Sequence, residues 1–182
     1  SKEFFGQDKY DRSFEPYQSL GSEFQNGNIS HQSCFSHKTP NDPISIANEE
    51  KVIASVDSPL IPFCMHHEDN QFVYLMEDET IPLFEGAQWP PLKYILMFMS
   101  FLHDLHQSGF IYLRRDFKNI VRCRDKIQIC AFDTCMQLGS DDCSSDMKDW
   151  DDVPSELTDS ICLGAFIYYA YTKKNILNGE AQ

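Results

Sequence analysis

Apolar residues recur at helical spacing between positions 92 and 106, and this repeat is typical of one buried helix face. The residues on this face are Leu92, Ile95, Leu96, Met99, Leu102 and His106. Pro91 suits the first turn of such a helix, because that position needs no backbone N–H donor. Gly109 provides a turn after it. We therefore predict a long helix that starts near Pro91 and is followed by a polar loop and two short strands, up to Leu138.

Three other stretches carry a clear pattern. Asn48–Pro62 predicts a short helix that follows Pro43 and ends at Asp57-Ser58-Pro59, with Val52, Ile53 and Val56 on its apolar face. Gln71–Glu77 is rich in aromatic and β-branched residues and predicts a strand. The apolar run after Thr158 predicts a second long helix with Asp159 as its N-cap. These elements together predict a mixed α+β fold.

Composition limits the classes of partner. The chain has 182 residues, of which 42% are hydrophobic, and its formal net charge is −13. Such a charge repels phosphate, so we expect neither nucleic acid nor an anionic membrane as a partner. No apolar run approaches the roughly 20 residues that span a bilayer. The seven cysteines form no CxxC pair, which suits buried thiols in a reducing compartment, cytoplasmic or nuclear.

Two neighbouring segments resemble the catalytic core of the eukaryotic protein kinases. They are LHDLHQSGFIYLRRDFKNIV, Leu102 to Val121, and KIQICAFDTCMQL, Lys126 to Leu138. The continuation Thr134-Cys135-Met136 is similar to the Rho-kinase, myotonic dystrophy kinase and citron branch of the AGC group. The resemblance implies a two-lobe fold: an N-terminal arm at 1–16, a reduced N-lobe at 17–78, and a C-lobe at 79–182 that is truncated after the family's helix F.

In the family, the first segment ends in a catalytic loop with a His/Tyr-Arg-Asp motif and a metal-binding Asn. Matching without gaps to Asn119 places Tyr112, Leu113 and Arg114 on the three positions of that motif. Arg114 then replaces the catalytic Asp. A guanidinium stays protonated and cannot accept the proton of a substrate hydroxyl. Asn119 keeps the metal-ligand position.

A second alignment of the loop stays open. It places Arg115-Asp116-Phe117-Lys118 on the family's Arg-Asp-Leu-Lys and restores Asp116 as the base. This alignment requires a deletion of two residues before Asn119.

The second segment carries Ala131-Phe132-Asp133 where the family has Asp-Phe-Gly. The methyl group of Ala131 offers no oxygen to magnesium. Asp133 lies two residues later and would face elsewhere on an extended backbone, although a changed turn would let it enter and retain weak metal binding. We therefore expect neither ATP nor magnesium as a functional cofactor.

The resemblance also assigns residues of a nucleotide site. Lys38 is the candidate for the ATP lysine, with an ordinary exposed lysine as the alternative, and Glu49 matches the helix C glutamate that pairs with it. Met76 falls near the gatekeeper position and Glu77 at the hinge. Asp159 matches the helix F Asp that ties down the backbone of the catalytic loop.

Several functions remain open. The first is an inactive pseudokinase that serves as a regulatory or scaffold module, whose partner is another protein: an active kinase or a second copy. The alternative is a divergent Ser/Thr kinase, or another ATP-dependent transferase, that uses Asp116 and Asp133. A third is metal-free nucleotide binding with Lys38 and Glu49 paired. The acidic stretch Gly139–Asp152 is either a solvated loop or an acidic docking strip.

Overall fold

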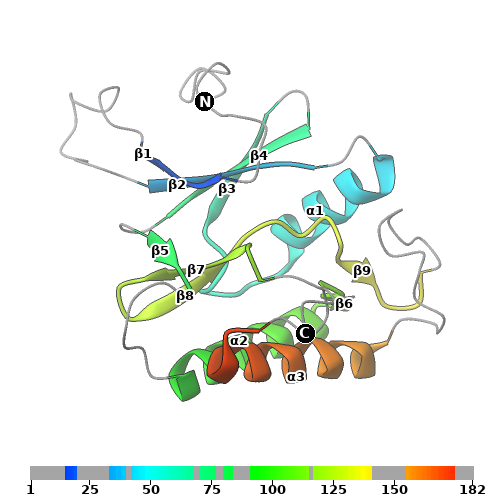
Figure 1. The fold of residues 1–182 in the computed structure, drawn as a ribbon. Helices are drawn as coiled ribbons and strands as arrows, with labels where there is room; N and C mark the ends of the chain where they lie inside the picture. The colour runs from blue at the N-terminus through cyan, green and yellow to red at the C-terminus, as the bar shows by residue number, and fades with distance from the viewer. Residues whose placement is uncertain are drawn as a thin grey trace.

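The computed structural model describes residues 15–19, 33–39, 42–67, 70–76, 80–83, 91–114, 117–140 and 155–174. This part of the chain is a mixed α+β fold (Figure 1). Its elements in order are β1 (Glu15–Ser19), β2 (Ser33–Lys38), α1 (Pro43–Ser55), β3 (Phe63–His67), β4 (Gln71–Leu75), β5 (Thr80–Pro82), α2 (Pro91–Gln107), β6 (Phe110–Ile111), β7 (Ile120–Cys123), β8 (Lys126–Ile129), β9 (Met136–Gln137) and α3 (Glu156–Thr172).

The first sheet is antiparallel and has the strand order β1-β2-β4-β3. In its register His37 of β2 lies opposite Phe72 of β4, and Phe72 lies opposite His66 of β3. Helix α1 follows β2 and lies beside the end of that strand (Figure 1). This connection brings the middle of α1 close to the last residues of β2.

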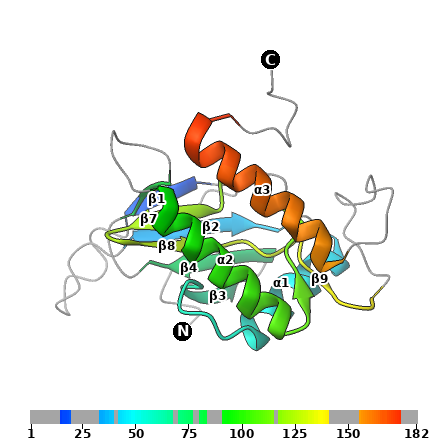
Figure 2. The same cartoon turned by 90° about the horizontal axis from the view of Figure 1, so that it is seen from below.

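The other strands lie between this sheet and the two long helices (Figures 1 and 2). Strands β5, β7 and β8 form a three-stranded sheet, and β6 pairs with β9. Seen from below, α2 and α3 cover the underside of the strands and lie next to each other (Figure 2). Phe98 of α2 and Phe166 of α3 join them, with ring centroids 4.4 Å apart. Tyr112 packs edge-on against Phe98 and Phe101, so an aromatic core supports the loop after β6.

The predicted helix at Pro91 is confirmed, but its predicted buried face is partly wrong. Leu92, Leu96 and Met99 are 61%, 55% and 45% exposed. The buried residues of this helix are Tyr94, Ile95, Phe98, Phe101, Leu102 and Leu105. Larger aromatic side chains bury more apolar area, and they face α3 and the strands in place of the aliphatic stripe.

Two helix starts also differ from the prediction. Helix α1 includes Pro43 in its first turn, because the Asp42 carboxylate caps it by accepting from the Ile44 N–H at 3.1 Å. Helix α3 begins after Ser155, whose N–H donates to the Thr158 hydroxyl at 3.0 Å. Asp159 is therefore not an N-cap but a buried residue of the first turn. The strand predicted at Gln71 and the strands after Asn119 are confirmed.

The described cysteines fit the predicted buried thiols. Cys123, Cys130, Cys135 and Cys162 are buried, and Cys64 is partly exposed. Burial raises the pKa of the Cys130 and Cys135 thiols well above the usual value, so both stay protonated and unreactive. Among the helices of the described ranges, none has the length and apolarity needed to cross a bilayer. Residues 1–14 and 141–154, which hold most of the predicted arm and acidic stretch, lie outside the described residues.

Candidate functional site

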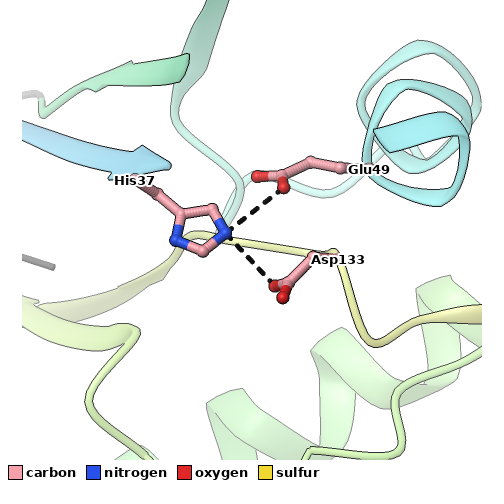
Figure 3. Close-up of side chains that lie close together, drawn as sticks. All are labelled: His37, Glu49 and Asp133. Atoms are coloured by element: carbon pink, nitrogen blue, oxygen red, sulfur yellow. Dashed lines mark ion pairs between the residues drawn. The ribbon is translucent and has the colours of Figure 1, made fainter. Parts of the chain in front are cut away.

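Four charged side chains from separate elements meet in the interior and form what we call the buried ionic cluster. His37 Nε2, at the end of β2, lies 3.5 Å from Glu49 Oε2 of α1 and 3.3 Å from Asp133 Oδ1, which follows β8 (Figure 3). Arg114 Nη1, which follows β6, lies 3.0 Å from the same Asp133 oxygen. All four residues are buried. The cluster therefore joins the first sheet and α1 to the loops above α2.

Glu49 is held by neutral donors as well as by His37. Thr39 Oγ1 donates to Glu49 Oε2 and Tyr74 OH donates to Glu49 Oε1, each at 2.5 Å. The Glu49 side chain is 0% exposed. Because both of its oxygens accept hydrogen bonds, this carboxylate is held in one orientation beside His37.

His37, and not Lys38, is the residue of β2 that faces Glu49. Successive side chains of a strand point to opposite faces, so only one of these two neighbours can reach α1. Lys38 is half-buried on the other face. In place of the expected pairing of Lys38 with Glu49, the structure has an ion pair of His37 with Glu49. Sequence reasoning missed His37 because the basic residue was chosen by charge, although the alternation of the strand allowed either neighbour.

Asp133 enters the cluster through a changed turn, the alternative that the sequence left open, and the first expectation that it faces away is wrong. That expectation assumed an extended backbone, but Ala131 has a φ of 63° and Cys135 N–H donates to Phe132 O at 3.1 Å in a tight turn. The turn buries Phe132 against Tyr74 and Phe101. It also directs Asp133 towards Arg114, which donates to Ala131 O at 3.3 Å.

The backbone next to Arg114 is strained and tightly held. Leu113 is fully buried with a φ of 54°, a left-handed conformation that costs energy for a residue with a branched side chain. Asp159 of α3 compensates by accepting from the Tyr112 N–H at 2.7 Å and the Leu113 N–H at 2.9 Å. His106 Nε2 lies 2.7 Å from Asp159 Oδ2. The predicted role of Asp159 as a tie for this loop is confirmed.

Asn119 and Met76, the candidate metal ligand and gatekeeper residue, are both buried. The Asn119 amide donates to Tyr112 OH at 2.5 Å and to Cys130 O at 2.8 Å, so it links the loop to the segment after β8. Met76 is fully buried in the core. Two other residues singled out from the sequence, Glu77 and Asp116, lie outside the described residues.

Charges within the cluster balance. Burial by itself lowers the pKa of His37, but the Asp133 and Glu49 carboxylates outweigh it and raise this pKa from 6.5 to about 9. Burial opposes ionisation of Asp133, yet His37 and Arg114 hold its pKa well below the usual range. At neutral pH the two carboxylates thus face an imidazolium and a guanidinium. The cluster carries no net charge, which is the condition under which buried ions are tolerated.

The cluster also has the ligand types of a divalent metal site. One atom each from His37, Glu49 and Asp133 lies within 4.8 Å of the others. A metal would need the neutral imidazole, since only the deprotonated nitrogen can bind it. It would also have to displace Arg114 from Asp133. The chain's own cations therefore compete for the position that a metal ion would take.

Stability is expected to fall as the pH rises through the range in which His37 loses its proton. The folded-state pKa lies above the unfolded value of 6.5, so the contribution of His37 is complete below 6.5 and is lost as the pH approaches 9. Between about pH 6 and pH 8 this amounts to roughly 2 kcal/mol. Urea unfolding at both pH values measures it.

The control variants for this pH dependence are His37→Gln and His106→Gln. The Asp159 carboxylate raises the pKa of His106 as well, so this residue adds a smaller effect of the same sign. His37→Gln should remove most of the pH dependence and His106→Gln a minor part. An unchanged dependence in His37→Gln would contradict a protonated His37 in the folded state.

Neither a scan against protein-family models nor a search of curated proteins finds a match to this chain.

Proposed function

We propose that this chain is a catalytically inactive, protein kinase-like domain that works by binding another protein. In this proposal β1–β4 and α1 form a reduced N-lobe, and α2, α3 and the remaining strands form the C-lobe. The family pattern that the chain resembles is that of the AGC group and its Rho-kinase-like branch. The single observation that carries the proposal is the ion pair of Arg114 with Asp133 inside a cluster that His37 and Glu49 complete.

The position of Arg114 supports the loss of proton transfer. In the ungapped alignment this residue replaces the base, and its guanidinium is buried against Asp133 and the Ala131 carbonyl. A guanidinium does not accept a proton, and separating a buried guanidinium from its carboxylate costs several kcal/mol of free energy, as is typical of buried ion pairs. A substrate hydroxyl would meet a fixed cation where proton transfer requires a base.

The charge balance supports the loss of Mg-ATP binding. Phosphate groups are bound by cations that are free to pair with them, usually with magnesium as a bridge. Here His37 and Arg114 already neutralise Glu49 and Asp133. Ala131 contributes no carboxylate, and Lys38 lies on the opposite face of its strand from His37. Binding a triphosphate would therefore require this network to break.

Nucleotide binding and phosphoryl transfer are the properties that test the proposal. We expect ATP with magnesium to shift the melting temperature by less than about 1 °C, because a ligand stabilises very little when its concentration is far below its dissociation constant. We also expect no transfer of radiolabel from the γ-phosphate to the chain or to a general protein substrate. The matched variant is Arg114→Gln, which removes the charge and keeps most of the side-chain length.

The same measurements decide the alternative, a divergent Ser/Thr kinase that uses Asp116 and Asp133. The observation that favours it is the proximity of Asp133 to His37 and Glu49, which forms a set of metal-ligand types. A magnesium-dependent shift that disappears in Asp133→Asn would support this alternative. Label transfer that disappears in Asp116→Asn would do the same, and either result contradicts an inactive domain.

A further inference from the structure

Helix α3 carries an apolar stripe on its exposed side. Leu157, Ile161, Tyr168 and Tyr171 are 76%, 53%, 42% and 64% exposed. Gly164, in the middle of the stripe, is also exposed, and a Cβ atom built on it meets nothing within 4 Å. Single exposed apolar residues are ordinary on a protein surface, but a continuous stripe along one helix marks an interaction site.

The spacing of the stripe indicates what kind of element covers it. Positions 157, 161, 164, 168 and 171 alternate steps of four and three, which is the average repeat of 3.5 residues found where two helices pair. Gly164 lets a second backbone approach closely because it has no side chain. The surface therefore fits an α-helix better than an extended peptide or a small ligand.

The charges along α3 indicate which helix covers the stripe. From Ser160 to Thr172 the sequence has no charged residue, while Glu156 lies in the first turn and Lys174 just after the end. Gly164 stands midway, eight residues from either end of the helix. An identical helix laid antiparallel over Gly164 brings the acidic end of each copy to the basic end of the other. A parallel pair would bring like charges together.

We propose that α3 is a homodimer contact, in which two copies of the chain pack antiparallel about a two-fold axis at Gly164. Leu157 then lies against Tyr171 of the second copy, and Ile161 lies near Tyr168 of the second copy. Such an interface is self-complementary, as a two-fold axis requires. Each chain has a net charge of −13, and the stripe itself carries no charge, so the two copies meet where their repulsion is smallest. A second copy of the chain would then be the protein partner of the proposed function. Only the biological use of the dimer, and not the contact itself, rests on that proposed function.

The mass of the full chain in solution tests the contact. Between about 1 and 200 µM we expect light scattering or sedimentation to move from a 21.1 kDa species to one of twice that mass, since small interfaces dissociate in the micromolar range. Ile161→Asp should weaken association at least tenfold, because it places a charge inside the apolar contact. The Ile161 side chain is exposed in the monomer, so the variant keeps the monomer core. Ala54→Asp, on an exposed position of α1, is the matched control and should dimerise normally.

Charge exchange tests the orientation. Glu156→Lys and Lys174→Glu should each weaken the dimer, and the double variant should restore it only if the helices are antiparallel. Gly164→Cys should form an intermolecular disulfide under mild oxidation, in contrast to Ala54→Cys. A 21.1 kDa species at every concentration, or a dimer that Ile161→Asp leaves intact, would overturn the proposal. Neither result affects the nucleotide test of inactivity, so the two proposals can fail separately.

Discussion

Replacing Asp159 with alanine is expected to destabilise the folded chain by about 3–5 kcal/mol, the range for loss of one partner of a buried ionic contact. The Asp159 carboxylate accepts from the N–H groups of Tyr112 and Leu113 and contacts His106 Nε2. In the variant these two buried N–H groups have lost their acceptor, and the left-handed Leu113 loses the contact that holds it. Urea unfolding measures the change in free energy.

Hydrogen exchange locates this effect within the chain. The amides of Tyr112 and Leu113 should exchange much faster in Asp159→Ala, while amides in β4 change only with global stability. Asp159→Asn is the intermediate variant, because the two N–H groups bond to different oxygens of Asp159 and asparagine keeps only one of them as an acceptor. Glu156→Ala, on an exposed position of the same helix, is the control and should change stability by less than about 0.5 kcal/mol. Protected Tyr112 and Leu113 amides in Asp159→Ala would contradict the assigned role.

Replacing Asp133 with alanine is expected to cost a similar amount, about 3–5 kcal/mol, because it removes the carboxylate that pairs with the buried Arg114 guanidinium at 3.0 Å. His37 keeps its contact with Glu49 at 3.5 Å but loses its contact with Asp133 at 3.3 Å. The excess positive charge, and not the small volume of the lost side chain, is the reason for the large effect. Denaturant unfolding at about pH 6 measures it while His37 is protonated.

A double-mutant cycle separates this charge effect from packing. Arg114→Met removes the guanidinium and retains an apolar side chain of similar length, and Asp133 in that variant still faces His37. The double variant Asp133→Ala with Arg114→Met restores charge balance and should be more stable than Asp133→Ala alone. We expect a coupling energy of at least about 1.5 kcal/mol. Additive effects would show that Arg114 and Asp133 do not form a stabilising pair.

Sequence patterns located the elements better than their orientations. The helix at Pro91 was predicted from apolar spacing, yet Leu92 and Leu96 on the predicted face are exposed. A helix repeat specifies that one face is buried, and several faces of this helix are apolar. Phe98 and Phe101 face inward because the aromatic core between α2, α3 and the loop after β6 accepts their volume. That core exists only once distant segments have come together.

The site shows the same division. Arg114 and Ala131 were singled out because the chemistry of a residue type is visible in the sequence: a guanidinium is not a base, and a methyl group does not bind magnesium. Asp159 was assigned correctly as a tie for the loop. His37 was missed, because its role depends on which face of β2 meets α1. For Asp133 the sequence left two orientations open, and the left-handed conformation of Ala131 decided between them.

The sequence by itself determined the α+β class and the main helices and strands, because spacing and side-chain chemistry are local properties. Only the tertiary structure decided that Arg114, Asp133, His37 and Glu49 neutralise one another, since ion pairs between residues 12 to 96 positions apart depend on how the elements pack. It also decided which apolar residues of α2 and α3 remain exposed. Burial is a property of the assembled fold, and no single helix specifies it.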